Sequence, residues 1–185
     1  MHRNTCALEE MPAAARRYDS CQIFYRETRL PRKGVAMEEM QKEQFSLIRF
    51  LHAHEQSYQT ALEEVREGEK KTHWIWYIFP QYRGLGLSPV AEYYAIRSLQ
   101  EARGYISEPV LRSHLFEISQ ALLDLKENDA EKILGYPDNL KLRSCMTLFL
   151  IADPDAGILQ QVLDKFFKGI PDEKTIELVK TENRA

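Results

Sequence analysis

Long apolar runs, paired cysteines and repeats are all missing from this sequence. No run of about 18 apolar residues occurs, which predicts that nothing in the chain spans a membrane. The first residues lack the continuous apolar stretch of a secretory signal. The three cysteines, an odd number, have no paired or metal-binding spacing, as is typical of proteins in a reducing compartment. These absences predict a soluble, cytoplasmic protein.

An excess of positive charge is missing from most of the chain. Residues 1–36 contain seven Lys/Arg and four Asp/Glu, whereas the remainder contains 18 Lys/Arg and 24 Asp/Glu. Neutralising phosphates requires clustered cations, so this acidic body argues against general binding of nucleic acid. The basic tail could contact RNA or an acidic partner, but its composition favours a solvated extension.

A break near residue 34 separates this extension from the folded part of the chain. Residues 1–36 show no sustained hydrophobic period and end in Leu-Pro-Arg-Lys-Gly, a strong breaker of regular structure. Helix signals become continuous from Met37 onward. We predict a flexible or alternative-start extension over 1–36 and a single domain over 40–182, long enough to bury one core.

Helical periodicity dominates this domain. Apolar residues recur at three- and four-residue spacing in its first helix, and capping residues followed by proline predict the start of the next two. The predicted class is therefore all-α, a single globular domain of about seven helices with short connections. The predicted helices cover 41–67, 88–105, 108–125, 128–134, 138–151, 157–168 and 173–181.

One aromatic segment does not fit this pattern. The run from Trp74 to Phe79 has the β-branched and aromatic composition of a strand. No second run resembles it, however, and a lone strand has no pairing partner. A short buried helix is equally compatible with the run, so the sequence leaves both structures open.

Residues 72–86, THWIWYIFPQYRGLG, have the composition of a ligand pocket. Five aromatic rings are interleaved with His73, Gln81 and an arginine, and both tryptophans of the protein, Trp74 and Trp76, lie here. Rings supply contact area and polar groups supply orientation, which is what binding a small molecule requires. A core-packing segment with hydrogen-bonded His and Trp N–H groups has the same composition.

Polar residues within two apolar helices are further candidates. Lys141, Ser144 and Thr147 recur every three residues and so share one helix face, where they would form a buried polar network or contact an oxyanion. The hydroxyls could instead bond carbonyls of their own helix while the lysine reaches water. Asp164 and Lys165 are adjacent near the end of the penultimate helix, where a surface charge pair is the plain interpretation.

The turn before residue 88 resembles half of a phosphate-binding loop. Gly84 and Gly86 precede the Ser88 helix start, and Arg83 stands beside them, as would suit an anion. The third glycine and the preceding strand of a dinucleotide fingerprint are missing, so the pattern favours a plain turn into a helix.

Metal binding and nucleophilic catalysis are not indicated. His52 and His54 point to different faces of a helix, and His52 with Glu55 leaves only two ligands, too few for a closed metal site. Cys145 does not stand at a helix N-terminus, so we predict a buried, inert thiol there.

Five motifs occur in the order found in a known family. Through them the chain resembles the bacterial proteins of domain-of-unknown-function family 1810, some of which are labelled calpastatin. The resemblance covers nearly all of 45–178, and it implies a mainly α-helical fold with no established activity. The motifs are THWIWYIFPQ, GLG with its following serine, YYAI, GYPDNLKLRSCMTLF and VLDKFF.

Three positions depart from the family pattern. A Gln of the first helix is His54 here, and a Leu-Gly-x-Arg-Leu stretch has Arg112 and His114 in place of its Gly and Arg. If such a position contacts a ligand, the resemblance implies a different ligand or affinity in this protein. The candidate residues that keep the family's types are His73, Trp74, Trp76, Gln81, Lys141, Ser144, Thr147, Asp164 and Lys165.

We therefore predict that these segments converge on one pocket for a small, anionic, nucleotide-like metabolite. Trp74 or Trp76 would stack on a ring, His73 and Gln81 would hydrogen-bond, and Lys141 would meet negative charge. If the protein is an enzyme, His73 is the best general acid or base, because imidazole titrates near neutral pH. A non-enzymatic protein-interaction module is the alternative. The sequence indicates no metal, and it identifies neither a cofactor nor an oligomeric state.

Overall fold

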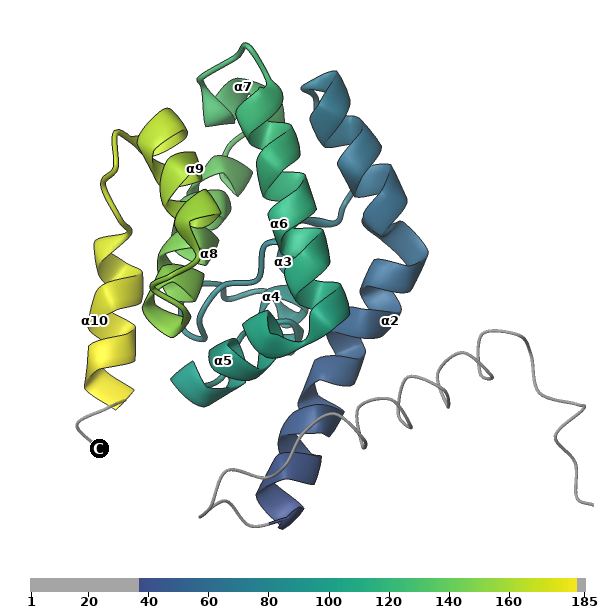
Figure 1. Cartoon of the computed structure of the whole chain (residues 1–185), viewed down its shortest axis with the longest axis vertical. Helices are drawn as coiled ribbons and strands as arrows, with labels where there is room; N and C mark the ends of the chain where they lie inside the picture. The colour runs from purple at the N-terminus through teal and green to yellow at the C-terminus, as the bar shows by residue number, and fades with distance from the viewer. Residues whose placement is uncertain (1–36, 183–185) are drawn as a thin grey trace, which may run out of the picture. The chain divides into compact units, whose positions relative to one another are not determined.

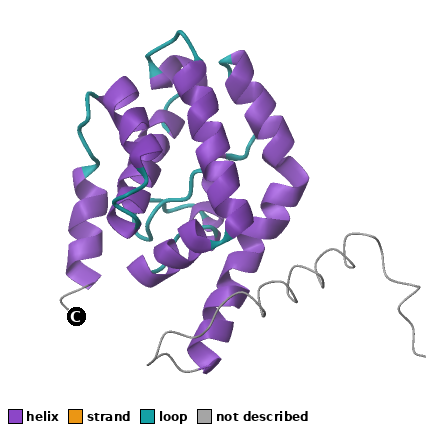
Figure 2. Cartoon of the chain, in the orientation of Figure 1, coloured by secondary structure: helices purple, strands orange, loops and turns teal. Residues whose placement is uncertain are grey.

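Residues 37–182 are described by a computed structural model, in which all the regular elements of that range are helices (Figures 1 and 2). The predicted all-α class is confirmed. The predicted extension over 1–36 lies outside the described residues. The helices are α2 (Met37–Glu67), α3 (Ile75–Ile78), α4 (Pro89–Tyr93), α5 (Leu99–Ser107), α6 (Pro109–Asp124), α7 (Ala130–Leu134), α8 (Asp138–Ala152), α9 (Gly157–Phe167) and α10 (Glu173–Glu182).

The chain divides into two units, Met1–Glu39 and Met40–Ala185, and the second unit contains α2 from Met40 onward and helices α3 to α10. Between residues 37 and 182, no helix is long and apolar enough to cross a membrane.

Helix α8 is the centre of this second unit. It packs against α5, α7, α9 and α10, and α6 packs against α5 and α9 (Figure 1). Every residue from Ser144 to Phe149 is buried, so α8 presents buried side chains on all its faces. This part of α8 therefore lies in the interior of the unit, whereas its first turns carry the partly exposed charges of Asp138, Lys141 and Arg143.

The starts of three helices have N-cap hydrogen bonds, and those at Ser88 and Glu108 were predicted. Ser88, Ser98 and Glu108 each accept a hydrogen bond from a backbone N–H in the first turn of α4, α5 and α6. Proline occupies the first turn of α4 and α6, where its missing N–H costs nothing. Asp129 caps α7, one residue after the predicted start at 128, by accepting a bond from the Glu131 N–H.

The predicted helix over 88–105 is wrong as a single element, because the chain breaks between α4 and α5. Ile96 lies in this break and forms a parallel bridge with Tyr82. The Ile96 N–H donates to the Gln81 carbonyl at 2.9 Å, and the Arg83 N–H donates to the Ile96 carbonyl at 2.9 Å. These bonds between distant segments replace the helical bonds that Ile96 would otherwise make.

The aromatic segment is a short helix, which settles the choice left open by the sequence. Helix α3 contains a single turn, and Trp74, Ile75, Ile78 and Phe79 are each at most 1% exposed. The rings of Trp74 and Phe79 pack edge to face at 6.0 Å between centroids. Burial of these side chains therefore holds α3 in place, since so short a helix has little stability of its own.

Candidate functional site

Trp74, one of the predicted ligand-binding residues, belongs to the hydrophobic core. Its side chain is 1% exposed, and its indole N–H donates to Glu64 Oε2 at 2.7 Å. The same carboxylate accepts bonds from the Lys71 backbone N–H and from the backbone N–H and hydroxyl of Thr72. Glu64 thus anchors the chain that leads from α2 into α3.

The protonation of Glu64 reflects these contacts. Burial by itself would raise the pKa of this carboxyl group, but the hydrogen bonds from Lys71, Thr72 and Trp74 favour the charged form and lower the pKa to about 2. Glu64 is therefore ionised at neutral pH and serves as an acceptor of hydrogen bonds.

Lys141 lies beside Trp76, as a common pocket requires, but its charge already has a partner. Lys141 Nζ is 2.8 Å from Asp138 Oδ1 and 4.8 Å from the centroid of the Trp76 ring. Lys70 Nζ approaches the other Asp138 oxygen at 2.9 Å and lies 5.4 Å from the centroid of the Trp74 ring. Asp138 therefore joins two lysines, each placed over a tryptophan, and this network connects α8 to the end of α2.

Ser144 and Thr147 connect α8 to the last helix. Ser144 Oγ is 2.8 Å from Thr175 Oγ1, and the Thr175 hydroxyl donates to Asp172 Oδ2 at 2.6 Å. Thr147 Oγ1 accepts from the Asp172 backbone N–H and donates to the Arg143 carbonyl, both at 2.8 Å. Asp172 Oδ2 also accepts from the Thr175 backbone N–H at 2.9 Å, which caps the first turn of α10. Both hydroxyls of α8 are thus engaged in holding α10.

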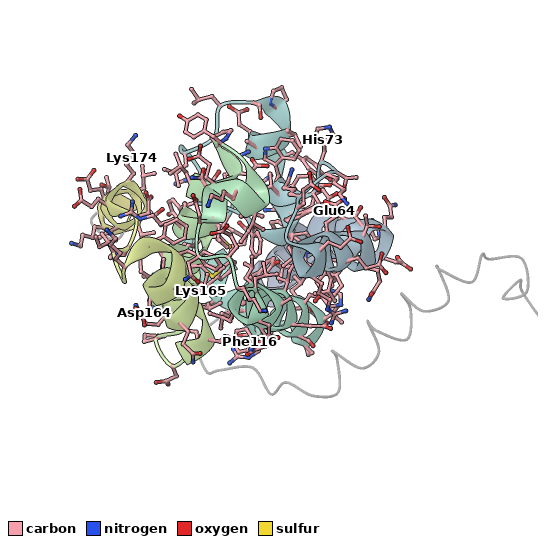
Figure 3. The ribbon with its side chains drawn as sticks, turned by 90° about the horizontal axis from the view of Figure 1, so that it is seen from above. Glu64, His73, Phe116, Asp164, Lys165 and Lys174 are labelled. Atoms are coloured by element: carbon pink, nitrogen blue, oxygen red, sulfur yellow. The ribbon has the colours of Figure 1, made fainter. Side chains whose placement is uncertain are left out.

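Asp164 and Lys165 lie on α9, well away from His73 and Glu64 (Figure 3). Asp164 is exposed and accepts a bond from Gln160 at 2.8 Å. Lys165 Nζ donates to three backbone carbonyls at the C-terminus of α6. Two of these bonds, to Leu122 and Leu123, measure 3.0 and 2.9 Å, and the third is to Leu125. The loss of solvent around the ammonium group lowers the pKa of Lys165.

The nine predicted residues therefore do not lie together. Trp76 and Lys141 are in contact, but Ser144 and Thr147 face α10, and the pair on α9 is remote. His73 is exposed, and Gln81 takes part in the bridge through its backbone carbonyl.

A metal site and a reactive thiol each have structural requirements, against which the described residues can be compared. Within residues 37–182, no group of three or more His, Cys, Asp or Glu side chains is placed to hold a metal ion. Cys145 is 0% exposed, and burial raises the pKa of its thiol well above the ordinary value. Its burial agrees with the inert thiol predicted from the sequence.

The parallel bridge between Tyr82 and Ile96 places two arginines side by side. Arg83 and Arg97 each follow one of the bridged residues, and strands joined in this way lie about 4.8 Å apart. Tyr82 and Ile96 are buried, whereas Arg83, in the turn that follows Tyr82, and Arg97 are exposed. Neither guanidinium forms an ion pair or side-chain hydrogen bond with a residue of the described range.

These arginines line a cleft of about 560 Å³, which we call the arginine cleft. Apolar walls come from Leu87, Ala95 and Leu178 of α10, and Glu92 of α4 is the acidic residue among the described lining residues. The lining residues are Arg83, Gly84, Gly86, Leu87, Glu92, Ala95, Arg97 and Leu178.

Two glycines shape the floor of the cleft. Gly84 has a φ of +91°, a left-handed conformation that other residues rarely adopt. A Cβ atom on Gly86 would lie 2.5 Å from Cβ of Ala91, so only glycine lets this turn pack on α4. In the sequence, Arg83 and the two glycines resemble half of an anion loop, although the pattern favours a plain turn. Arg97 was not among the residues predicted from the sequence. Arg97 lies beside Arg83 only because a bridge joins residues 14 positions apart, and no local sequence pattern indicates that bridge.

The fold and the cleft define a class: an all-α protein with a cationic cleft of small-molecule size. The chain belongs to the family described as protein of unknown function (DUF1810), whose sequence profile matches residues 44–179. It is also similar to a solved structure, that of the conserved hypothetical protein Rv1873 from Mycobacterium tuberculosis. The two are 40% identical with a TM-score of 0.71, over 74% of this chain and 97% of that one. No curated protein matches the chain.

Proposed function

We propose that this protein binds a small anionic metabolite, of the nucleotide-like class predicted from the sequence, in the arginine cleft. The observation that carries the proposal is the placement of Arg83 and Arg97 on adjacent backbone segments, with no acidic partner for either in the described range. Arginine is suited to this role, because its planar guanidinium donates paired hydrogen bonds to phosphate or carboxylate oxygens.

Electrostatics favours an anion at this position. Two unit charges at 4 Å repel each other by about 1 kcal/mol even in bulk water, and by more where solvent is partly excluded. A dianionic phosphate between Arg83 and Arg97 would replace this repulsion with two attractions. The parallel bridge fixes both backbones before the ligand arrives, so the cost of ordering the site on binding is low.

The remaining walls suit an organic ligand rather than a bare ion. The cleft volume of about 560 Å³ falls within the range of roughly 300–1,000 Å³ typical of small-molecule sites. Leu87, Ala95 and Leu178 supply an apolar surface, and Glu92 can accept hydrogen bonds from ligand hydroxyl groups.

The cationic residues predicted from the sequence are less suited to meeting an external anion. Lys141 already has Asp138 as its counterion, and Lys165 donates to three carbonyls of α6. Arg83 and Arg97 keep their donors available. The same anionic ligand class is therefore proposed at a different place in the fold.

A thermal-shift experiment on the full chain tests this proposal. The probes are inorganic phosphate, adenosine monophosphate and ribose 5-phosphate, with uncharged adenosine as the matched control ligand. A ligand at a hundredfold excess over its Kd stabilises the folded state by about 2.7 kcal/mol, which raises Tm by several degrees. We expect adenosine monophosphate to raise Tm and adenosine to have a much smaller effect.

Two variants and a control locate the site. Arg83→Gln and Arg97→Gln should each reduce the ligand-induced shift, whereas Arg103→Gln should leave it unchanged, because Arg103 is an exposed arginine of α5 that does not line the cleft. Equal shifts in all three variants would reject the site. No shift with any anion would reject the proposal and favour a protein-interaction module.

A further inference from the structure

His54 and His114 form a contact between α2 and α6 that no part of the arginine cleft uses. Their Nδ1 atoms are 3.0 Å apart, and the two rings are nearly parallel at 5.3 Å between centroids. His54 is 2% exposed, and its Nε2 lies 2.8 Å from the Tyr77 carbonyl oxygen. The two histidines are 60 residues apart in the sequence and meet in the fold.

The hydrogen-bond partners determine where the protons lie. The Tyr77 carbonyl can only accept, so His54 Nε2 carries the proton of that 2.8 Å bond. A neutral His54 therefore has an unprotonated Nδ1. Its neighbour at 3.0 Å, His114 Nδ1, must donate to it. In the neutral pair, the two ring nitrogens without a proton are His54 Nδ1 and His114 Nε2. His54 Nδ1 already accepts a hydrogen bond from His114, so His114 Nε2 is the nitrogen that remains available for an added proton.

The surroundings make His114 the better place for an added proton. Its ring stacks on Tyr58 at 3.6 Å between centroids with an interplanar angle of 5°, and an aromatic face attracts a cation. The Tyr58 hydroxyl donates to Glu117 at 2.9 Å, and this carboxylate favours a charged His114. Protonating His114 Nε2 leaves its Nδ1–H bond to His54 intact.

A proton on His54 has the opposite effect. The added proton would sit on Nδ1 and point at the Nδ1–H of His114 across 3.0 Å, so an attractive contact would become a repulsive one. Burial is the largest cause of the low pKa of His54, about 4; the Tyr77 carbonyl opposes the lowering and the nearby His114 adds to it. Desolvation lowers the pKa of His114 as well, which Glu117 partly offsets.

Other titratable groups surround the pair on every packed element. The Tyr105 hydroxyl lies 3.4 Å from His54 Nε2, and Arg66 bonds Glu117 at 3.2 Å. Burial raises the pKa of Tyr105 well above its ordinary value, and the thiol and carboxyl groups nearby raise it further. With the two histidines, the titratable and charged groups of the cluster are Tyr58, Arg66, Tyr105, Glu108, Glu117 and Cys145.

We propose that His54 and His114 form a pH-sensitive latch between α2 and α6. The latch accepts one proton on His114 Nε2 without opening, and it opens when a second proton reaches His54 Nδ1. Only proton transfers from solvent are involved. The latch is independent of the arginine cleft, so either proposal can fail while the other stands.

Nitrogen-detected NMR of the imidazole rings in the full chain tests the latch without any mutation. At neutral pH we expect His54 protonated at Nε2 and His114 protonated at Nδ1. On acidification His114 should titrate first with the fold unchanged, and protonation of His54 should coincide with loss of the contacts between the two rings. The reverse tautomers, or a protonated His54 with those contacts intact, would overturn the proposal.

Proton uptake on unfolding gives a second, independent measurement. Unfolding of the wild type between pH 6.5 and about 4 should take up one more proton than unfolding of His54→Gln, because His54 binds that proton only when unfolded. Gln59→Ala is the control, since Gln59 is an exposed residue of α2 with no titratable group, and it should keep the wild-type proton uptake. Equal uptake in the wild type and His54→Gln would contradict the latch.

Discussion

Glu64 illustrates how one charged side chain can determine the path of a segment. It is 6% exposed, and its two oxygens accept bonds from Lys71, Thr72 and Trp74, all within the turn that follows α2. Burying a carboxylate is costly unless its oxygens are hydrogen-bonded, and here those bonds also fix where Trp74 enters the core. The sequence places Glu64 in an ordinary helical position and gives no sign of this role.

Replacing Glu64 with glutamine should destabilise the fold. The amide keeps one acceptor oxygen and replaces the other with a donor group, so buried N–H groups lose their partner at a cost of about 2 kcal/mol or more. Urea denaturation monitored by tryptophan fluorescence measures this change. The exposed neighbour Glu63→Gln is the control, and an effect of equal size in both variants would contradict the role assigned to Glu64.

The lowered pKa of Glu64 also predicts an acid dependence. Because the pKa of this carboxyl falls from 4.5 to about 2 on folding, its contribution to stability is full above pH 4.5 and is lost as the pH falls toward 2. Glu64→Gln should lack this part of the acid dependence, whereas Glu63→Gln should retain it. Measuring the free energy of unfolding of both variants from pH 5 to about 2 checks the sign of the effect.

At the scale of the elements, local signals predicted most helices and failed where distant segments meet. Periodicity and caps placed α6, α8, α9 and α10 within a few residues. The helix predicted over 88–105 failed because Ile96 bonds to residues 81 and 83, a pairing that no local pattern reveals. The candidate site shows the same limit of local sequence patterns. Trp76 does lie near Lys141, but no local pattern indicates Asp138 as the counterion or Arg97 as the neighbour of Arg83.

Lys165 should contribute to stability by capping α6. Its ammonium group meets the partial negative charge at the C-terminus of this helix through three carbonyls. Lys165→Met keeps most of the apolar contact and removes these donors, which should cost about 1–3 kcal/mol. Thermal unfolding compared with the exposed Lys168→Met measures the difference. Equal Tm values for the two variants would show that the cap contributes nothing.

The link between α8 and α10 should affect both packing and the cleft. Thr175→Val removes the hydroxyl between Ser144 and Asp172, so α10 should exchange its amide hydrogens faster. Because Leu178 of α10 lines the arginine cleft, ligand affinity should also fall, with neither arginine altered. Hydrogen exchange and ligand titration on this variant test both statements, with the exposed Lys174→Ala as the control.

At the scale of the whole molecule, we propose that Arg83 and Arg97 serve ligand binding and do not stabilise the fold. Side-by-side guanidinium groups without acidic partners repel each other, so Arg83→Gln should leave the free energy of unfolding unchanged or raise it by up to about 1 kcal/mol. Urea denaturation without ligand measures this. A loss of about 2 kcal/mol or more would show that Arg83 supports the fold, because exposed residues without specific contacts usually change stability by far less.

Isothermal titration of adenosine monophosphate into the wild type, Arg83→Gln, Arg97→Gln and the double variant tests the central claim most directly. If both guanidinium groups contact one anion, each single substitution should weaken binding about tenfold or more, equivalent to about 1.4 kcal/mol. The loss in the double variant should also differ from the sum of the two single losses, because the side chains share one partner. Unchanged affinity in the double variant would contradict the assignment of the arginine cleft as the binding site.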